Sequence, residues 1–302
     1  MSTQTSRLRM QKTTDDKIFY VFVYIVLSVL TVTLLYPLIY IVSSSLSSGV
    51  AVTTGKVILW PVDFSIEGYK RVFGYSKVWI GYRNTLFYTV VGTAINVAVT
   101  LFCAYPLARR NLPHRGVIMF LFSFTMIFSG GMIPSYLLVS SLGLINTVWA
   151  LLLPGAMGVY QMIVTRTFIS VTIPEELLEA TQIDGCNDFR FFSMFVLPLS
   201  KAIIAVIALQ YAVGHWNSYF SAFLYLSDNK LYPLQLYLRE ILVLSQIDTS
   251  ELVDDETLIR LQGMAELLKF ALIVVATAPI MCLYPFLQKY FVTGIMIGSI
   301  KG

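Results

Sequence analysis

The residues of this sequence that could do chemistry are few and widely scattered. The two histidines, His114 and His215, lie too far apart for a metal pair on one helix. The three cysteines, Cys103, Cys186 and Cys282, provide neither a disulfide framework nor the spacing of a zinc site. No nucleophile stands beside a recognisable base. We therefore expect no catalytic residue, no metal site and no cofactor bound by this chain, which disfavours an enzyme.

The sequence also lacks a loop that would cradle a nucleotide phosphate. The nearest candidate runs from Gly49 to Lys56, has one residue too many and continues with Val57 instead of serine or threonine. If the protein concentrates a solute, each tenfold gradient costs about 1.4 kcal/mol. That energy would have to come from a separate protein.

The composition indicates that much of the chain lies in a membrane. Hydrophobic residues make up 57% of the sequence and charged residues only 13%, whereas a soluble domain carries roughly 25% charge. The mean hydropathy is +0.73, so too little polar surface remains to cover a water-facing globule. The net charge of +4 is modest and forms no dense basic stripe, which argues against nucleic-acid binding.

Six apolar runs are long enough to cross a hydrocarbon core of about 30 Å. We expect helices, because each run must satisfy its own backbone hydrogen bonds in lipid. The sequence thus predicts an all-α polytopic membrane protein with a cytoplasmic segment 1–17, a transmembrane domain 18–288 and a cytoplasmic tail 289–302. The expected helices cover Ile18–Val42, Thr85–Leu107, Gly116–Val139, Val148–Phe168, Ala202–Leu226 and Leu267–Phe286. Within the third, Gly130-Gly131 beside Pro134 is either a flexing point or a site of close packing.

Basic residues favour the connections on the side of the N-terminus, so we expect both chain ends to be cytoplasmic. Trp79 and Trp149 then fall at the outer membrane boundaries, where amphipathic rings prefer to lie. Two long outer connections, near Ser43–Asn84 and Ser227–Glu266, are expected to dock a binding protein, or alternatively to be solvated connectors.

The first apolar run also has to be compared with a signal peptide, because basic residues precede it. Its length of about 25 residues exceeds the 7–15 of a signal core. A retained helix is therefore favoured, although Ser43–Ser48 offers a stretch of small residues where cleavage would be an alternative.

The connection 169–200 is the most informative part of the sequence. Pro174 begins a short helix, and the acidic residues behind it suit the positive end of the helix dipole. The helix is interrupted at Asp184-Gly185, where glycine tolerates a left-handed backbone. A second helical piece is expected over Asp188–Phe195, ending before Pro198. Four apolar residues of this elbow suggest that it docks into a partner: Leu177, Leu178, Phe189 and Phe192.

The same stretch resembles a known family. Its spacing of residues looks like the Glu-Ala-Ala loop that couples ABC importer permeases to their ATPases. Thr181 departs from the usual second alanine, a small change in size. The residues of the expected coupling loop are Glu179, Ala180, Thr181, Asp184, Gly185, Asp188, Phe189 and Pro198.

The resemblance covers nearly the whole chain and indicates carbohydrate permeases similar to the second subunit of the maltose permease. Within that group the chain is most similar to the branch named for lipoprotein-associated and putative aldouronate oligosaccharide transport. The similar stretches are Ser129–Pro134, Gly143–Thr147, Trp216-Asn217 and the closing tail Gly294–Gly302.

Fold, partners and location are implied by this resemblance. The fold would be that of a type I ABC importer permease in the bacterial cytoplasmic membrane. The partners would be a homologous permease forming a heterodimer, two ATPase subunits that bind ATP and Mg²⁺, and an extracellular solute-binding lipoprotein. The substrate would be a saccharide, imported by alternating access.

A cluster of polar and aromatic residues within the fifth run could line the substrate pathway. Polar groups at membrane depth tend to face a cavity or another helix, and sugars bind to aromatic faces and hydrogen-bonding groups. The candidates are Tyr211, His215, Trp216, Asn217 and Tyr219. Interhelical hydrogen bonding between two permeases is the alternative, and we favour it. The same alternative applies to Asn96 and Gln161.

Two other kinds of transporter remain as alternatives. An ion-coupled secondary transporter would need an acidic or basic group within the membrane, and the interiors of the six runs contain no Asp, Glu or Arg. An ABC permease for a non-sugar solute is separated from a sugar permease only by the resemblance.

Overall fold

The computed structural model describes residues 14–244 and 262–282, and all regular structure in these ranges is helical. The expectation of an all-α protein is confirmed. The chain divides into two compact units, which are described separately. One comprises residues 1–69 and 248–274, and the other comprises residues 70–247 and 275–302.

The first unit contains α1 (Thr14–Ser45), α2 (Gly49–Thr53), the beginning of α3 (Glu67–Gly74) and the first part of the helix Gln262–Cys282. α1 has a window of mean hydropathy 2.6 with none of its residues buried, so its apolar surface is left for lipid or another subunit.

Serines at the end of α1 hold the segment that follows it. Ser43, Ser44, Ser45 and Ser47 are all buried. Ser47 Oγ accepts a hydrogen bond of 3.0 Å from the Val62 amide, and Ser43 Oγ donates to the Leu59 carbonyl. These bonds satisfy backbone groups of the irregular stretch between α2 and α3.

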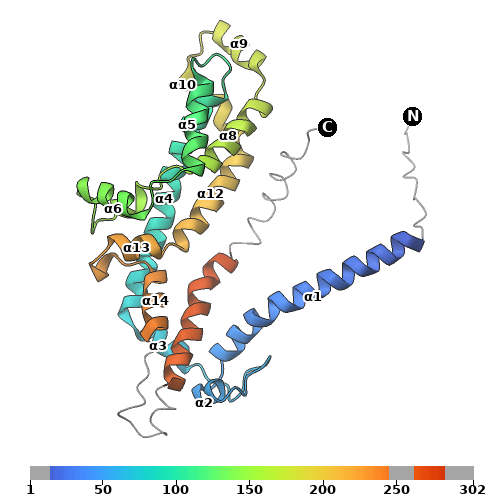
Figure 1. The fold of residues 1–302 in the computed structure, drawn as a ribbon, viewed down its shortest axis with the longest axis vertical. Helices are drawn as coiled ribbons and strands as arrows, with labels where there is room; N and C mark the ends of the chain where they lie inside the picture. Colours follow the sequence, from blue (N-terminus) through green and yellow to red (C-terminus); the bar gives the residue numbers. More distant parts are fainter. Residues whose placement is uncertain (1–13, 245–261, 283–302) are drawn as a thin grey trace. The chain divides into compact units, whose positions relative to one another are not determined.

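The second unit is built around one long helix, α4, against which α8 and α12 pack (Figure 1). Its helices are α4 (Ser76–Ala108), α5 (Arg115–Ile127), α6 (Met132–Ser141), α7 (Trp149–Leu152), α8 (Val159–Thr172), α9 (Glu175–Ile183), α10 (Asp188–Phe191), the π-helix η1 (Phe192–Val196), α11 (Leu197–Leu199), α12 (Lys201–Trp216), α13 (Phe220–Tyr225), the 3₁₀-helix η2 (Asn229–Leu231) and α14 (Leu234–Leu244).

A stripe along α4 explains this packing. Every fourth residue from 84 to 108 is buried, and most of these side chains are small or polar: Asn84, Tyr88, Gly92, Asn96, Thr100, Ala104 and Ala108. Residues four apart lie on one face of a helix. Small side chains on that face let neighbouring helices approach closely in a membrane.

The third expected span is divided in the structure. We predicted one helix over Gly116–Val139, but α5 and α6 meet at an angle of 114°. Gly131 between them has a φ of 87°, a conformation that cannot continue a right-handed helix and that favours glycine. The sequence left a flexing point and a site of close packing open at this position, and the structure has a sharp break there.

The fourth expected span, Val148–Phe168, is also divided. α7 ends at Leu152, and α8 begins only at Val159. The backbone between them is satisfied by side chains of other helices. Asn96 Nδ2 donates to the Gly155 carbonyl at 2.5 Å, and the Gly158 amide donates to Tyr211 Oη at 2.9 Å. Non-helical backbone at membrane depth is tolerated only where it has such partners.

The fifth expected span, Ala202–Leu226, consists of α12 and α13 with a break at residues 217–219. The sixth corresponds to the helix Gln262–Cys282 as far as it is described, and the expected tail 289–302 lies outside the described residues. Three described helices are long and apolar enough to cross a membrane, or five if each bent pair forms one span.

The connection after α13 is fastened to α4. Asn84 Nδ2 donates to the Lys230 and Tyr232 carbonyls, and Tyr88 Oη donates to the Leu231 carbonyl at 2.8 Å. Tyr237 Oη also donates to the Asn229 carbonyl at 2.6 Å.

Candidate functional site

The expected coupling loop forms an elbow of two short helical arms, which we define as residues 174–199. The first arm is α9, which starts after Pro174 and ends in a left-handed turn at Gly185, where φ is 77°. The Cys186 amide donates to the Thr181 carbonyl at 2.9 Å, and the Gly185 amide donates to the Gln182 carbonyl at 3.0 Å. This pair of bonds is the Schellman motif, which satisfies the last carbonyls of a helix.

The second arm begins at Asn187, whose side chain accepts a hydrogen bond of 2.8 Å from the Arg190 amide. We expected this arm to end before Pro198, but it continues through α10, η1 and α11 to Leu199. The reason is the π-helical segment, in which the Leu197 amide bonds to the Phe192 carbonyl, five residues back. The widened turn accommodates a proline that would clash within a regular α-helix.

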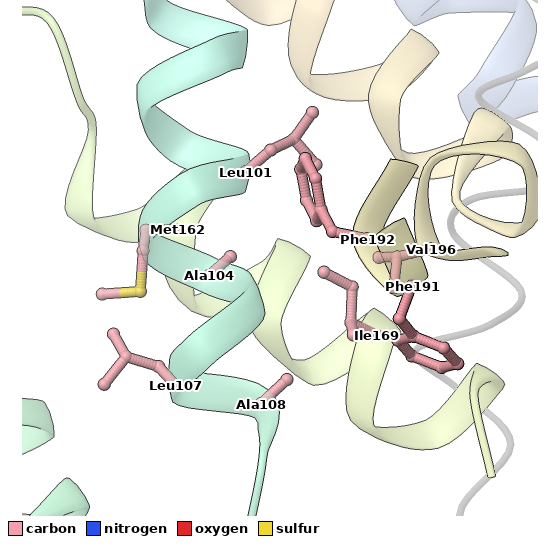
Figure 2. Packing of buried hydrophobic residues seen from close by; sticks show 9 residues of the cluster. All are labelled: Leu101, Ala104, Leu107, Ala108, Met162, Ile169, Phe191, Phe192 and Val196. Atoms are coloured by element: carbon pink, nitrogen blue, oxygen red, sulfur yellow. The ribbon is translucent and has the colours of Figure 1, made fainter. Parts of the chain in front are cut away.

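A hydrophobic core holds the elbow against the ends of two membrane helices (Figure 2). Phe192 is central to this core: its ring lies 5.4 Å from that of Phe102 and 5.3 Å from that of Tyr105. The buried members are Leu101, Ala104, Leu107 and Ala108 of α4, Met162 and Ile169 of α8, and Phe191, Phe192 and Val196 of the elbow. Because interiors of this kind are close-packed, we expect the elbow to move together with α4 and α8.

Ion pairs add a second attachment. Arg109, directly after α4, pairs with Asp188 at the start of the second arm, and its side chain is only 15% exposed. Arg110 Nε lies 3.4 Å from Glu175 Oε2 at the start of the first arm, and both side chains are exposed. A half-open cavity of about 410 Å³ lies between the elbow and the ends of α4, α5 and α8. Both arms thus form an ion pair with a residue directly after α4, and the less exposed pair, Arg109–Asp188, is the stronger attachment.

The outer surface of the elbow carries two large apolar side chains, Ile183 and Phe189, which we call the knob. They are 87% and 71% exposed. Exposed apolar groups on a projecting turn are typical of a surface that another protein covers. Sequence reasoning included Phe189 but missed Ile183, although an isoleucine directly before Asp184-Gly185 was a visible signal.

The other expected coupling residues divide between the surface and the core. The exposed ones are Glu179, Ala180, Asp184, Gly185, Asp188 and Pro198. Thr181 is buried, and its hydroxyl donates to the Leu178 carbonyl at 2.9 Å, so the departure from alanine is accommodated. Leu177, Leu178 and Phe192, which we expected to face a partner, pack instead against the core of this chain.

Gly185 provides a test of the turn. We expect Gly185→Val to leave membrane insertion intact but to abolish substrate-stimulated ATP hydrolysis, because a left-handed backbone costs an L-residue roughly 1–2 kcal/mol. No atom lies within 4 Å of a Cβ added at Gly185, so the cost within this chain is in the backbone. Gly185→Asn, which tolerates this conformation, should retain most of the stimulation. Normal stimulation in the valine variant would show that the turn is not required.

Three of the five expected pathway residues bond to other helices of this chain. Tyr211 Oη shares a hydrogen bond of 2.7 Å with Thr100 Oγ1, and His215 Nε2 shares one of 2.6 Å with Asn96 Oδ1. Gly92 leaves the room that the His215 ring fills. Trp216 Nε1 donates to the Ala276 carbonyl at 3.0 Å. We expected interhelical hydrogen bonds between two permeases, whereas these bonds join helices of the same chain.

The remaining two pathway candidates lie at the break between α12 and α13. The Asn217 side chain donates to the Val213 carbonyl at 2.9 Å. Tyr219 is 45% exposed. The five residues predicted as one cluster therefore have different places: three join helices, and two lie at the break between α12 and α13.

Comparison with known proteins identifies relatives along nearly the whole chain. The Bacillus subtilis strain 168 polygalacturonan/rhamnogalacturonan transport system permease protein YtcP is 40% identical over 95% of this chain and 99% of its own length. Protein LplC of the same organism is 41% identical over 88% of this chain and 89% of its own length. No family model matches.

The fold has a counterpart of known structure. A chain from the crystal structure of a bacterial ABC transporter involved in the import of the acidic polysaccharide alginate superposes with a TM-score of 0.83. The two are 34% identical, and the match covers 92% of this chain and 98% of that chain. Together with the elbow and the broken helices, these similarities show that the chain belongs to the membrane permease subunits of ABC importers, in their carbohydrate-uptake branch.

Proposed function

We propose that this chain forms one half of a transmembrane pathway for an oligosaccharide and couples that pathway to a separate ATPase through the elbow. Its relatives support an oligosaccharide. YtcP is named for polygalacturonan and rhamnogalacturonan, and the Bacillus subtilis permease MelC, 28% identical over 81% of this chain, is named for melibiose, raffinose and stachyose import.

The attachment of the elbow is the observation that carries the coupling role. The knob is exposed, while the opposite side of the elbow is packed against α4 and α8. A protein that grips the knob would therefore move both membrane helices. Closure of an ATPase dimer on ATP would change the distance between two such elbows and rock the helices between inward-open and outward-open states.

The remaining partners follow from this arrangement. A homologous permease would supply the second elbow and the other half of the pathway. ATP and Mg²⁺ would be bound by the two ATPase subunits, since this sequence has no phosphate-binding loop of its own. An extracellular lipoprotein would deliver the saccharide to the outer connections. The elbow and both chain ends would lie in the cytoplasm.

Photo-crosslinking from the knob tests this assignment. Benzoylphenylalanine at Ile183, in the assembled complex, is expected to capture the ATPase subunit. The same group at Phe120, which is 66% exposed on α5, serves as a control outside the elbow and should not capture it. The proposal fails if the probe at Ile183 captures no nucleotide-hydrolysing protein. It also fails if an impermeant thiol reagent reaches Asp184→Cys from outside intact cells.

A further inference from the structure

The cavity between the elbow and the ends of α4, α5 and α8, which we call the elbow cavity, is lined by charges of both signs. Its volume of about 410 Å³ is within the range of about 300–1,000 Å³ typical of small-molecule sites. The positive charges come from the end of α4 and the start of α5, and the negative charges come from the first turn of α9. These residues are Arg109, Arg110, Arg115, Glu175 and Glu176. An occupant that complements this lining carries both an anionic and a cationic group.

Two of the lining charges are left unpaired by the part of the chain that the structure describes. Arg115 is half-buried at the start of α5, and Glu176 is exposed in the first turn of α9. Within residues 14–244 and 262–282, neither side chain forms an ion pair or a hydrogen bond. The cavity therefore offers one available cation from α5 and one available anion from α9.

From the elbow cavity, α5 continues with one packed face and one open face. Ile118, Met119 and Phe122 pack against the core beneath the elbow. The opposite side has four apolar residues that are 46–66% exposed, Val117, Phe120, Leu121 and Phe124. Their spacing of three and four residues places them on one face of the helix. A molecule that fills the cavity and continues along this face would need a charged head and an apolar tail, which are the parts of a membrane phospholipid.

The signs of the lining charges distinguish between phospholipid headgroups. A purely anionic headgroup would bind Arg115 but would also meet the carboxylates of Glu175 and Glu176. Phosphatidylethanolamine carries both charges: its phosphate can accept charge-assisted hydrogen bonds from Arg115, and its ammonium can donate them to Glu176. Phosphatidylcholine has the same two charges, but its quaternary ammonium has no N–H to donate. The lining thus fits phosphatidylethanolamine best.

We propose that the elbow cavity binds the headgroup of phosphatidylethanolamine, with its phosphate on Arg115, its ammonium on Glu176 and an acyl chain along the open face of α5. The bound lipid would attach the first arm of the elbow to the start of α5. This inference requires only that the elbow lies at one face of the membrane. Its failure would therefore leave the proposed function intact.

Lipid binding to the complete complex, with its ATPases and binding protein, tests the proposal. The delipidated complex is titrated with single phospholipids, and bound lipid is counted by native mass spectrometry. Arg115→Gln and Glu176→Gln each remove one unpaired charge, so both variants should fold. The matched controls remove the same charges outside the cavity lining: Lys201→Gln at the start of α12, and Glu179→Gln three residues further along α9.

We expect the dissociation constant of phosphatidylethanolamine to rise about tenfold or more in Arg115→Gln and in Glu176→Gln, because each change removes hydrogen bonds to a charged group. The controls should change it by less than about twofold. Phosphatidylglycerol and phosphatidylcholine should bind the wild type about tenfold more weakly than phosphatidylethanolamine. Equal effects of lining and control substitutions would overturn the site, and equal binding of the three lipids would overturn its specificity.

A soluble competitor separates a lipid from a free phosphate compound. Glycerophosphoethanolamine has the same headgroup without acyl chains, so it should not displace the lipid at equal concentration. Displacement as effective as that by the lipid itself would show that the open face of α5 holds no acyl chain, and would overturn a lipid as the ligand. If another subunit fills the elbow cavity instead, the complex will show no saturable binding of phosphatidylethanolamine, which would also overturn the proposal.

Discussion

Replacing both knob residues in the double variant Ile183→Asp/Phe189→Asp should abolish substrate-stimulated ATP hydrolysis while leaving the permease inserted and folded. Both side chains are largely exposed in the isolated chain, so the substitutions remove little from its own packing. If the ATPase buries them, each contributes about 1.5–3 kcal/mol to docking. Losing both should weaken ATPase binding by a factor of about 100 or more.

The matched control keeps the apolar character of the knob. The double variant Ile183→Leu/Phe189→Leu should retain at least half of the stimulated rate, because it preserves most of the buried apolar surface. Co-purification of the ATPase with the permeases measures docking directly. If the aspartate variant retained the ATPase and normal stimulation, the knob would not be the docking surface.

The second large effect concerns the core beneath the elbow. Phe192→Ala should destabilise the elbow by about 3–5 kcal/mol, the cost of removing a buried phenylalanine ring from a packed core. Phe192 is 6% exposed and stacks on Phe102 of α4. Without this ring the elbow would no longer be held firmly against α4 and α8. We expect ATP hydrolysis to lose its dependence on substrate and the elbow to be cleaved readily by protease.

Phe189→Ala provides the control for this prediction, since it removes the same ring from the same arm of the elbow. Phe189 is 71% exposed, so its loss should leave the Tm and the protease resistance of the purified permease pair unchanged. Its effect should appear only as weaker binding of the ATPase. Equal protease sensitivity of the two variants would mean that the core around Phe192 does not support the elbow.

The elbow shows how local sequence can predict structure. Pro174, the acidic residues after it and Gly185 act through the backbone of their own neighbourhood, so a start and an end of a helix could be assigned without tertiary information. The second arm was predicted too short because the π-helical turn at Phe192–Val196 depends on packing against α4 and α8. The rule that a helix ends before a proline considers only local sequence, so it cannot include the effect of that packing.

The broken helices were the main difference between expectation and structure. Hydropathy over a window of residues measures whether a segment prefers lipid, and it gives the same value for a straight helix and for one bent at Gly131. What permits a break is a partner for the freed backbone groups. For Gly155 and Gly158 those partners are Asn96 and Tyr211, which are 59 and 53 residues away in the chain. The four-residue spacing of small residues on α4 was a signal in the sequence that would have indicated its packing face.

The sequence by itself determined the membrane class, the all-α fold and the position of the elbow, because composition, apolar runs and helix ends are local properties. Only the tertiary structure decided what the polar residues do. It used Tyr211, His215 and Trp216 to join helices and paired Arg109 with Asp188 across 79 positions. Side-chain roles of this kind depend on which residues meet in space, and a single sequence does not specify those distances.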